Sequence, residues 1–297
     1  AAGFLTSYWA IFTAIIISGV GSAIFHPEAA KLVNAISGGK RGTGMSIFST
    51  GGNGGFGVGP ILAVALVTAF GLKGLAFYGI GVPLLLLGRR IQPPAAAAGS
   101  APRRGAAPAP AGRNDWPAFS RLTAFIVLRS ACYVGITSFL PLFCIYALGA
   151  SHQAAGATLS VIALSGIVCT FLGGPLADRF GYVKMIRIGS LLLVPVIALT
   201  VFPHSLWWVF AMLVPISIAF NITYSPFVVL GQSYLAKSIG FASGITLGIS
   251  FSAGGILAPA LGCFGDVYGI GVTMGLLVIL AAMDALLAWW LPQPKRA

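Results

Sequence analysis

The sequence predicts an all-α membrane protein, and three observations lead to this fold class. Of the 297 residues, 58% are hydrophobic and 7% are charged, whereas a soluble domain has roughly 45–50% apolar and about 25% charged residues. The mean hydropathy is +0.96. The apolar residues also occur in long runs, and a helix needs about 20 of them to cross a bilayer core.

Nine apolar segments are long enough to be spanning helices. They are residues 5–28, 44–70, 73–90, 119–148, 154–177, 186–203, 206–235, 239–264 and 268–291. Residues 92–118 contain no apolar run, and alanine and proline alternate there with arginine, which is typical of a linker. The sequence therefore predicts a three-helix domain at 1–91, a linker at 92–118 and a six-helix bundle at 119–297.

The Lys and Arg residues indicate which ends of the helices face the cytoplasm. When the connections between segments are numbered alternately, one set carries 15 of the 17 basic residues and the other carries only Lys73. The remaining basic residue, Arg129, lies inside a segment. Because basic residues accumulate in cytoplasmic loops, we expect the linker, the 179–187 loop and the C-terminus to be cytoplasmic.

The two halves of the chain repeat each other at an offset of 199 residues. The offset places identical residues on each other, namely Pro27 on Pro226, Gly55 on Gly254 and Pro60 on Pro259. Parallel repeats of this kind occur in transporters. Because the second half has six expected helices and the first has three, we expect about 80 further residues, in three helices, before Ala1.

Several classes of function are disfavoured by the residues present. The basic residues that give the net charge of +12 lie almost entirely between apolar stretches. They form no basic stripe with interleaved aromatic residues, which argues against nucleic-acid binding. The four cysteines lie inside apolar segments without metal-ligand spacing, so we interpret them as buried apolar side chains. The sequence shows no Ser/His/Asp, metal or phosphate-loop constellation, and we expect no enzyme activity, no metal and no cofactor.

One charged, glycine-containing loop stands out on the predicted cytoplasmic side. From Gly174 it reads GPLADRFGYVK, which resembles the Gly-x-x-x-Asp-Arg-x-Gly loop of the major facilitator superfamily. The resemblance implies a conformational gate of Gly174, Asp178, Arg179 and Gly181, with Asp178 paired to Arg179 or to a neighbouring helix. A tight turn whose charges only set the topology is the alternative.

Two motifs in the first half extend the resemblance. The stretch STGGNGGFGVGP contains Gly55, Gly59 and Pro60, which resemble the fifth-helix signature of antiporters in the superfamily. Glycines four residues apart let another helix pack closely, and proline bends the helix, so plain packing and a direct antiport role both stay open. With GVGSAIFHPEAA before it, the stretch is similar to a bacterial drug-efflux family of this superfamily, along essentially the whole chain.

This resemblance implies bundles of the major facilitator type with twelve helices, of which nine are expected here. It also implies proton-coupled export of a small molecule by alternating access, in the bacterial inner membrane. Glu28 stands at the cytoplasmic end of the first segment, where it is expected to cap or gate the helices by pairing with Lys31, Lys40 or Arg41. A proton site at Glu28 is the alternative.

Arg129 is the candidate for substrate binding because a charge inside a membrane segment is costly. It is the only basic residue deep inside a predicted span, because the others lie at the ends of spans or between them. A guanidinium offers a bidentate fork to anions such as phosphonates, and Tyr133 and Thr137 follow it at helical spacing. Snorkelling of Arg129 toward the cytoplasm is the alternative.

Three polar residues of the second half each allow two interpretations. Asn221 and Tyr224 belong to a polar run that either lines a cavity or forms hydrogen bonds between helices. Asp284 in the last segment is either shielded by packing or a proton carrier, and its candidate partners include Arg129.

The sequence thus predicts a monomeric transporter whose partners are the lipid bilayer, a small molecule and protons. Uptake of a metabolite or sugar is one alternative. An inactive remnant without transport is the other.

The predicted topology can be tested with reporter fusions. A periplasm-only reporter fused after Ala297, or within 92–118, is expected to be inactive because the basic residues place both sites in the cytoplasm. Strong reporter activity at either site, measured at equal protein level, would refute the assignment.

Overall fold

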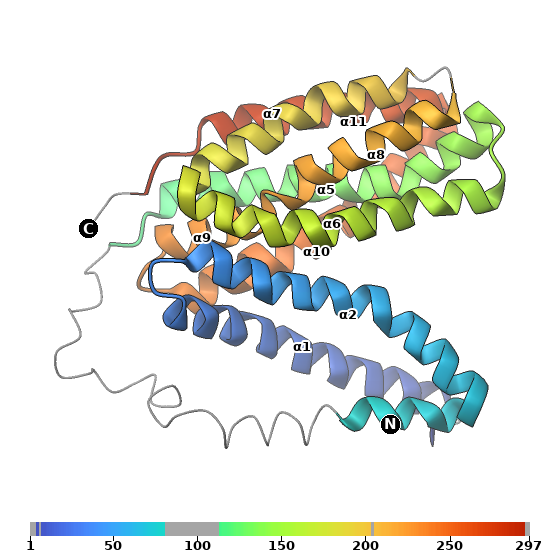
Figure 1. Ribbon diagram of the computed structural model, residues 1–297, viewed down its shortest axis with the longest axis horizontal. Coiled ribbons are helices and arrows are strands. Elements are labelled where there is room, and N and C mark those ends of the chain that lie inside the picture. The colour runs from blue at the N-terminus through green and yellow to red at the C-terminus, as the bar shows by residue number, and fades with distance from the viewer. Residues whose placement is uncertain (1–3, 6, 81–112, 203–204, 295–297) are drawn as a thin grey trace. The chain divides into compact units, whose positions relative to one another are not determined.

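The computed structural model describes residues 4–5, 7–80, 113–202 and 205–294, and these residues are helical apart from short turns (Figure 1). No strand occurs among them, which confirms the all-α class. The helices are α1 (Tyr8–Ile36), α2 (Arg41–Phe70), the 3-10 helix η2 (Leu72–Ile80), α5 (Trp116–Leu148), α6 (His152–Phe180), α7 (Tyr182–Val201), α8 (Leu206–Asn221), α9 (Tyr224–Tyr234), α10 (Ile239–Tyr268) and α11 (Ile270–Trp289).

The described helices follow most of the expected segments and differ at two of them. Seven described helical stretches are long and apolar enough to cross a membrane, counting 206–234 as one; α2, which covers the expected segment 44–70, is helical but is not among the seven. The stretch 206–234 is broken, because α8 ends at Asn221 and α9 begins at Tyr224. The expected segment 73–90 lies partly outside the described residues, and its described part belongs to the 3-10 helix η2. Hydropathy detects neither difference, since it reports composition and not backbone geometry.

Short polar residues and glycines set the ends of the helices after the linker. The Asp115 carboxylate accepts a hydrogen bond from the Ala118 amide at 3.0 Å, and Ser151 accepts one from the Ala154 amide at 3.2 Å. Both bonds satisfy amide groups that a first helical turn leaves free. Gly149 ends α5 in the left-handed region, with φ of 65°, which glycine adopts without steric cost.

The described residues form two compact units. One contains the described parts of 1–25 and 54–111, and the other contains 26–53 together with the described residues from 113 onward. The C-terminal part of α1 and the N-terminal part of α2 therefore pack with the helices that follow the linker. The predicted division into domains at 92–118 stays a prediction, and the linker itself lies outside the described residues.

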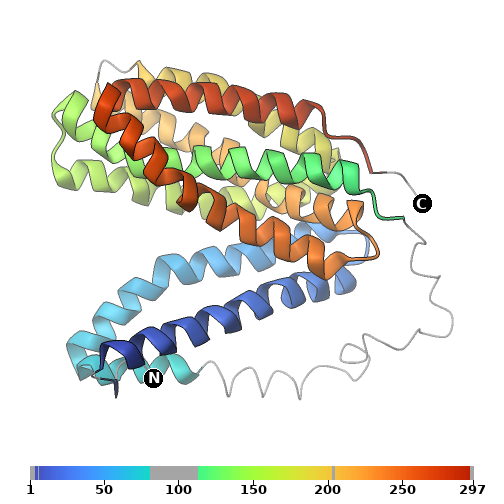
Figure 2. The same cartoon turned by 180° about the vertical axis from the view of Figure 1, so that it is seen from behind.

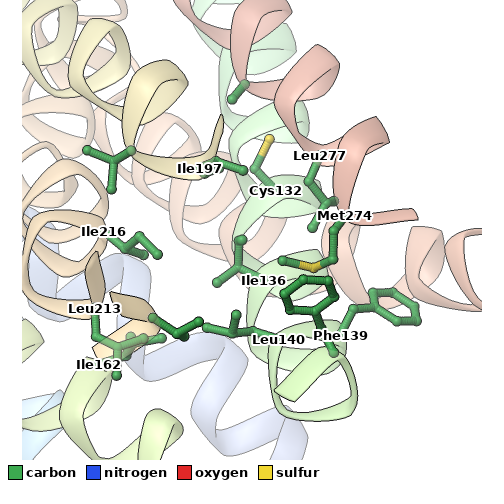
Figure 3. Packing of buried hydrophobic residues seen from close by; sticks show 14 of the residues in the cluster. Cys132, Ile136, Phe139, Leu140, Ile162, Ile197, Leu213, Ile216, Met274 and Leu277 are labelled. Atoms are coloured by element: carbon green, nitrogen blue, oxygen red, sulfur yellow. The ribbon is translucent and has the colours of Figure 1, made fainter. Parts of the chain in front are cut away.

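In the larger unit, α5 packs against α10 and α11 (Figure 2), while α8 packs against α6 and α7 (Figure 1). The side chains between these helices are apolar and closely packed. Figure 3 shows part of this core, with Ile136 and Leu140 of α5 lying among residues of neighbouring helices such as Ile216 and Leu277. A second buried cluster includes Ala30 and Met45 of the first half.

The crossing of α5 and α10 depends on the absence of a side chain at Gly254. A β-carbon there would approach the Ser130 carbonyl and lie 2.9 Å from Ser130 Oγ. The Ser130 hydroxyl donates to the Ser250 carbonyl at 2.8 Å, which ties the two helices together. Gly255, the next residue of α10, has open space around its own β-carbon position.

We therefore expect Gly254→Ala to destabilise the protein and Gly255→Ala not to. Overpacking a close contact costs about 1–3 kcal/mol, whereas alanine in an open helical position is at least as favourable as glycine. Thermal unfolding of the two purified variants tests this difference. Equal melting temperatures would show that the α5–α10 contact is loose enough to accept a methyl group.

Candidate functional site

Asp178, in the last turn of α6, caps the N-terminus of α2. Its carboxylate accepts hydrogen bonds from the Gly42 and Thr43 amides, both at 2.8 Å, and from the Thr43 hydroxyl at 2.7 Å. The Tyr182 hydroxyl, at the start of α7, donates to the same carboxylate at 2.7 Å. The first amides of a helix lack internal partners and attract negative charge. Asp178 thus supplies from another helix the group that an N-cap residue normally provides.

Glycines permit this approach of α6 to α2. A β-carbon at Gly42 would lie 2.6 Å from the Gly174 carbonyl oxygen and 2.7 Å from Asp178 Oδ1. A β-carbon at Gly174 would in turn collide with the Gly42 carbonyl. Gly181 has φ of 95° and separates α6 from α7, which returns the Tyr182 ring toward Asp178. The spacing of the loop motif therefore has a steric explanation at each glycine.

The partner of Asp178 is a neighbouring helix, which was one of the two expected alternatives. Arg179, the other, instead places its guanidinium over the Phe180 ring, with Cζ 5.3 Å from the ring centroid. Thr43 and Tyr182 were missed by the sequence analysis. A threonine in the first turn of α2 was the available signal for Thr43, but its partner is 135 residues away.

A second polar cluster joins α1, α9 and α10, and the sequence analysis missed it entirely. The Asn34 side-chain amide donates to Gln232 Oε1. The Gln232 amide donates to the Ser243 hydroxyl at 2.9 Å and to the Ala30 carbonyl at 3.3 Å. Asn34, Gln232 and Ser243 are 7%, 2% and 0% exposed. Isolated amide side chains in apolar segments were the available signal, since such groups often join membrane helices.

Glu28 pairs with Lys31, one of its three expected partners, at 3.7 Å. The two side chains are 66% and 55% exposed, and an exposed pair of this kind contributes little to stability. The gating role of Glu28 stays a prediction.

The packing motif of α2 also stays a prediction. No described atom lies within 4 Å of a β-carbon position at Gly55 or Gly59. Pro60 belongs to α2, and its side chain lies outside what the structure describes.

Arg129 of α5 is 5% exposed and contacts residues of α8 and α11. Its Nη2 donates to the Ala219 carbonyl at 2.9 Å and to the Phe220 carbonyl, at the end of α8. Its Nη1 lies 3.8 Å from Asp284 Oδ2 on α11. The guanidinium also lies over the rings of Phe125 and Phe220, at 5.7 and 5.2 Å from their centroids. Asp284, a candidate partner from the sequence, is thus its partner in the structure.

Tyr133 lies one turn beyond Arg129 on α5 and approaches the same aromatic ring. Its ring centroid is 5.3 Å from that of Phe220, in an edge-to-face arrangement. Tyr133 is 38% exposed, and Thr137, one turn further, donates its hydroxyl to the Tyr133 carbonyl at 2.9 Å. The structure therefore brings Arg129 and Tyr133 together around Phe220, and their role in binding substrate stays a prediction.

Asn221 and Tyr224 flank the break between α8 and α9. The Asn221 amide donates to the Ser217 carbonyl at 3.0 Å, and it packs against Gly166 of α6, where a β-carbon would lie 2.9 Å from Asn221 Nδ2. The Tyr224 ring stacks edge-on against Phe227 at 5.1 Å. Their contribution to a cavity wall stays a prediction.

Comparison with known proteins relates this arrangement of helices to one family. The family model described as Major Facilitator Superfamily matches residues 1–259. The chain belongs to the Major Facilitator Superfamily. It is therefore a multi-pass membrane protein of a transporter family, and not a member of an enzyme family.

Two curated relatives and two solved structures are similar to the chain. An uncharacterised MFS-type transporter of Bacillus subtilis, YfnC, is 29% identical over 99% of the chain and 73% of its own length. The fosmidomycin resistance protein of Escherichia coli is 28% identical over 88% of the chain and 65% of its own length. Crystal structures of the transporter FucP cover 99% and 96% of the chain and 78% of FucP, with TM-scores of 0.69 at 18% and 17% identity. One captures the outward conformation, and the other is described as the E. coli fucose:proton symporter.

We expect Asp178→Asn to loosen the contact between α2 and α6. The asparagine keeps the shape but loses the charge, and its NH2 group would face the amide donors of α2. Hydrogen bonds to a charged group contribute about 1.5–3 kcal/mol each. Spin labels at Lys40→Cys and Lys184→Cys, in a chain whose four native cysteines are replaced, should report a longer and broader distance distribution.

The matched control is Asp266→Asn. It removes an exposed carboxylate near the C-terminal end of α10 and leaves Asp178 and the start of α2 unchanged. It should leave the distribution unchanged. An unchanged distribution in Asp178→Asn as well would mean that the carboxylate does not hold α2 against α6.

Proposed function

We propose that this protein is a proton-coupled exporter of a drug or small anionic metabolite, which works by alternating access in the bacterial inner membrane. The observation that carries the proposal is the capping of α2 by Asp178. It supports a cytoplasmic gate, in which a segment of the first half is held against helices that follow the linker.

Alternating access needs a closure that is specific and can also open. The Asp178 cluster suits this need, because its donors are backbone amides and hydroxyls that water satisfies once the contact separates. The Asn34–Gln232–Ser243 cluster supplies a second contact of the same kind between α1 and the helices α9 and α10. Both clusters are polar, and the apolar cluster that contains Ala30 and Met45 lies beside them, so separation also exposes some hydrophobic surface to water.

A binding surface for the transported molecule is supported by the exposed side of α5. Arg129, Tyr133 and Thr137 are spaced by four residues and share one face of this helix. Tyr133 and Thr137 offer hydroxyl groups at this face, and Arg129, buried behind them, adds positive potential when Asp284, 3.8 Å away, is protonated. Such a surface favours anionic compounds that also carry an apolar part.

Export is favoured over uptake because one curated relative is named for resistance to a drug. The fosmidomycin resistance protein is 28% identical to the chain, whereas the likeness to the fucose:proton symporter is at 17% identity and concerns the fold alone. Protons as the coupling ion, the inner membrane and a monomeric state belong to the same proposal.

Drug sensitivity of cells distinguishes the candidate functions. The chain is expressed together with any coding sequence in frame upstream of Ala1, and fosmidomycin is the probe. Export predicts a several-fold rise in resistance, uptake predicts greater sensitivity, and an inactive remnant predicts no change. Arg129→Gln should abolish the resistance, and Arg129→Lys should keep part of it because the positive charge survives while the bidentate geometry is lost.

The control for protein level and insertion is Asp266→Asn, which is expected to export as the unaltered protein does. Resistance that persists in Arg129→Gln, at equal protein level, would remove Arg129 from the binding surface. Resistance absent from the unaltered protein would contradict export of this compound.

A further inference from the structure

The break between α8 and α9 creates an acceptor site inside the larger unit. The last carbonyls of a helix have no amide of a following turn to accept from, and the negative end of the helix dipole lies there. Ala219 and Phe220 belong to the last turn of α8, and α9 starts with Pro226 in its first turn. Their carbonyls accept from Arg129 Nη2, and the Phe220 carbonyl also accepts from the Thr223 hydroxyl at 3.0 Å.

On its other side, Arg129 faces a carboxylate whose oxygens accept no hydrogen bond from the described residues. Asp284 is 0% exposed, and neither of its oxygens has a hydrogen-bond partner among the described residues. Arg129 Nη1 and Ser190 Oγ, which lie near it, likewise have no such partner within the described part of the chain. A buried charge without hydrogen bonds is costly unless an opposite charge compensates it. At 3.8 Å, Arg129 supplies charge compensation without a direct hydrogen bond.

The surroundings of Asp284 contain few other groups that could set its charge. From α5 it faces Arg129 and the Cys132 thiol, and from α7 it faces the Ser190 hydroxyl. The remaining helix packed against α11 is α10, whose titratable residues Cys263, Asp266 and Tyr268 are exposed at its C-terminal end. Arg129 is therefore the cation, among the described residues, on which the ionised form of Asp284 depends.

We propose that Asp284 is a proton-binding site whose protonation is controlled by the position of Arg129. The guanidinium is shared between two acceptors, the carbonyls at the end of α8 and the carboxylate on α11. When it lies close to Asp284, the carboxylate stays ionised. When it is withdrawn, a proton from water adds to one carboxylate oxygen, and the neutral acid can donate a hydrogen bond to Ser190. The return of Arg129 releases the proton to water.

This site gives the structure a way to link helix movement to proton uptake. Arg129 is bonded to the end of α8, so a shift of α8 away from α11 separates the charge pair and favours protonation. The role in coupling rests on the proposed transport function, whereas the proton site itself does not depend on it.

Infrared spectroscopy of the purified chain in lipid nanodiscs tests the site, because a protonated carboxylic acid has its own carbonyl band. Near neutral pH, Arg129→Gln should gain one such band that the unaltered protein lacks. The double variant Arg129→Gln with Asp284→Asn should lack it again, and Arg129→Lys should behave as the unaltered protein does. The exposed-site variant Asp266→Asn should leave every spectrum unchanged.

Two results would overturn the proposal. One is a folded Arg129→Gln protein without the new band, and the other is a band that persists in the double variant. If Arg129→Gln does not fold, acid titration replaces it. The unaltered protein should then develop a band that Asp284→Asn, which keeps the Arg129 bonds to α8, does not show, and equal titrations of the two proteins would overturn the proposal.

Export of fosmidomycin separates this proposal from the proposed function. If the infrared bands behave as expected but no export occurs, the proton site stands and the proposed function fails. If export occurs and Asp284→Asn leaves its dependence on the pH gradient unchanged, the coupling role of Asp284 is overturned.

Discussion

The carboxylate of Asp178 stabilises the ends of two helices at once, and the contact between α2 and α6 depends on it. Asp178 sits at the C-terminal end of α6, where a negative charge is unfavourable for its own helix. The N-terminus of α2 presents free amides, which an anion stabilises. Each helix end thus supplies what the other needs. This pairing requires the backbones of α2 and α6 to come very close, which explains why positions 42 and 174 are both glycine.

Two clusters of buried polar groups in this apolar chain differ in how their hydrogen bonds are satisfied. In the Asn34–Gln232–Ser243 cluster the Gln232 side chain is bonded at both its oxygen and its nitrogen, although all three residues are buried. A fully bonded network of this kind specifies one arrangement of the helices. Around Asp284 the carboxylate, the nearby hydroxyl and one guanidinium nitrogen stay without hydrogen bonds among the described residues. Such a site responds to a change of charge far more readily than a satisfied network does.

The interruption between α8 and α9 connects these observations to the family. Discontinuous helices in transporters place unwound backbone and helix ends at the sites where ions bind. Here the interruption presents carbonyl oxygens to Arg129, and it lies beside Asn221 and Tyr224, which the sequence had marked as an unusual polar run. The membership of the chain in the Major Facilitator Superfamily gives this local geometry its functional context.

The sequence by itself determined the all-α membrane class, most of the spanning segments and the family, because hydropathy and loop motifs are local properties of the chain. It also singled out Asp178 and Arg129, since a charge next to or inside an apolar segment is costly wherever it finally lies. Only the tertiary structure decided that Asp178 bonds to α2 rather than to Arg179, that Gln232 meets Asn34, and that Arg129 lies between the end of α8 and Asp284. The sequence could not select these partners, because they come from helices far apart in the chain. Which polar groups meet is decided by helix packing, and close packing depends on where glycines let two backbones touch.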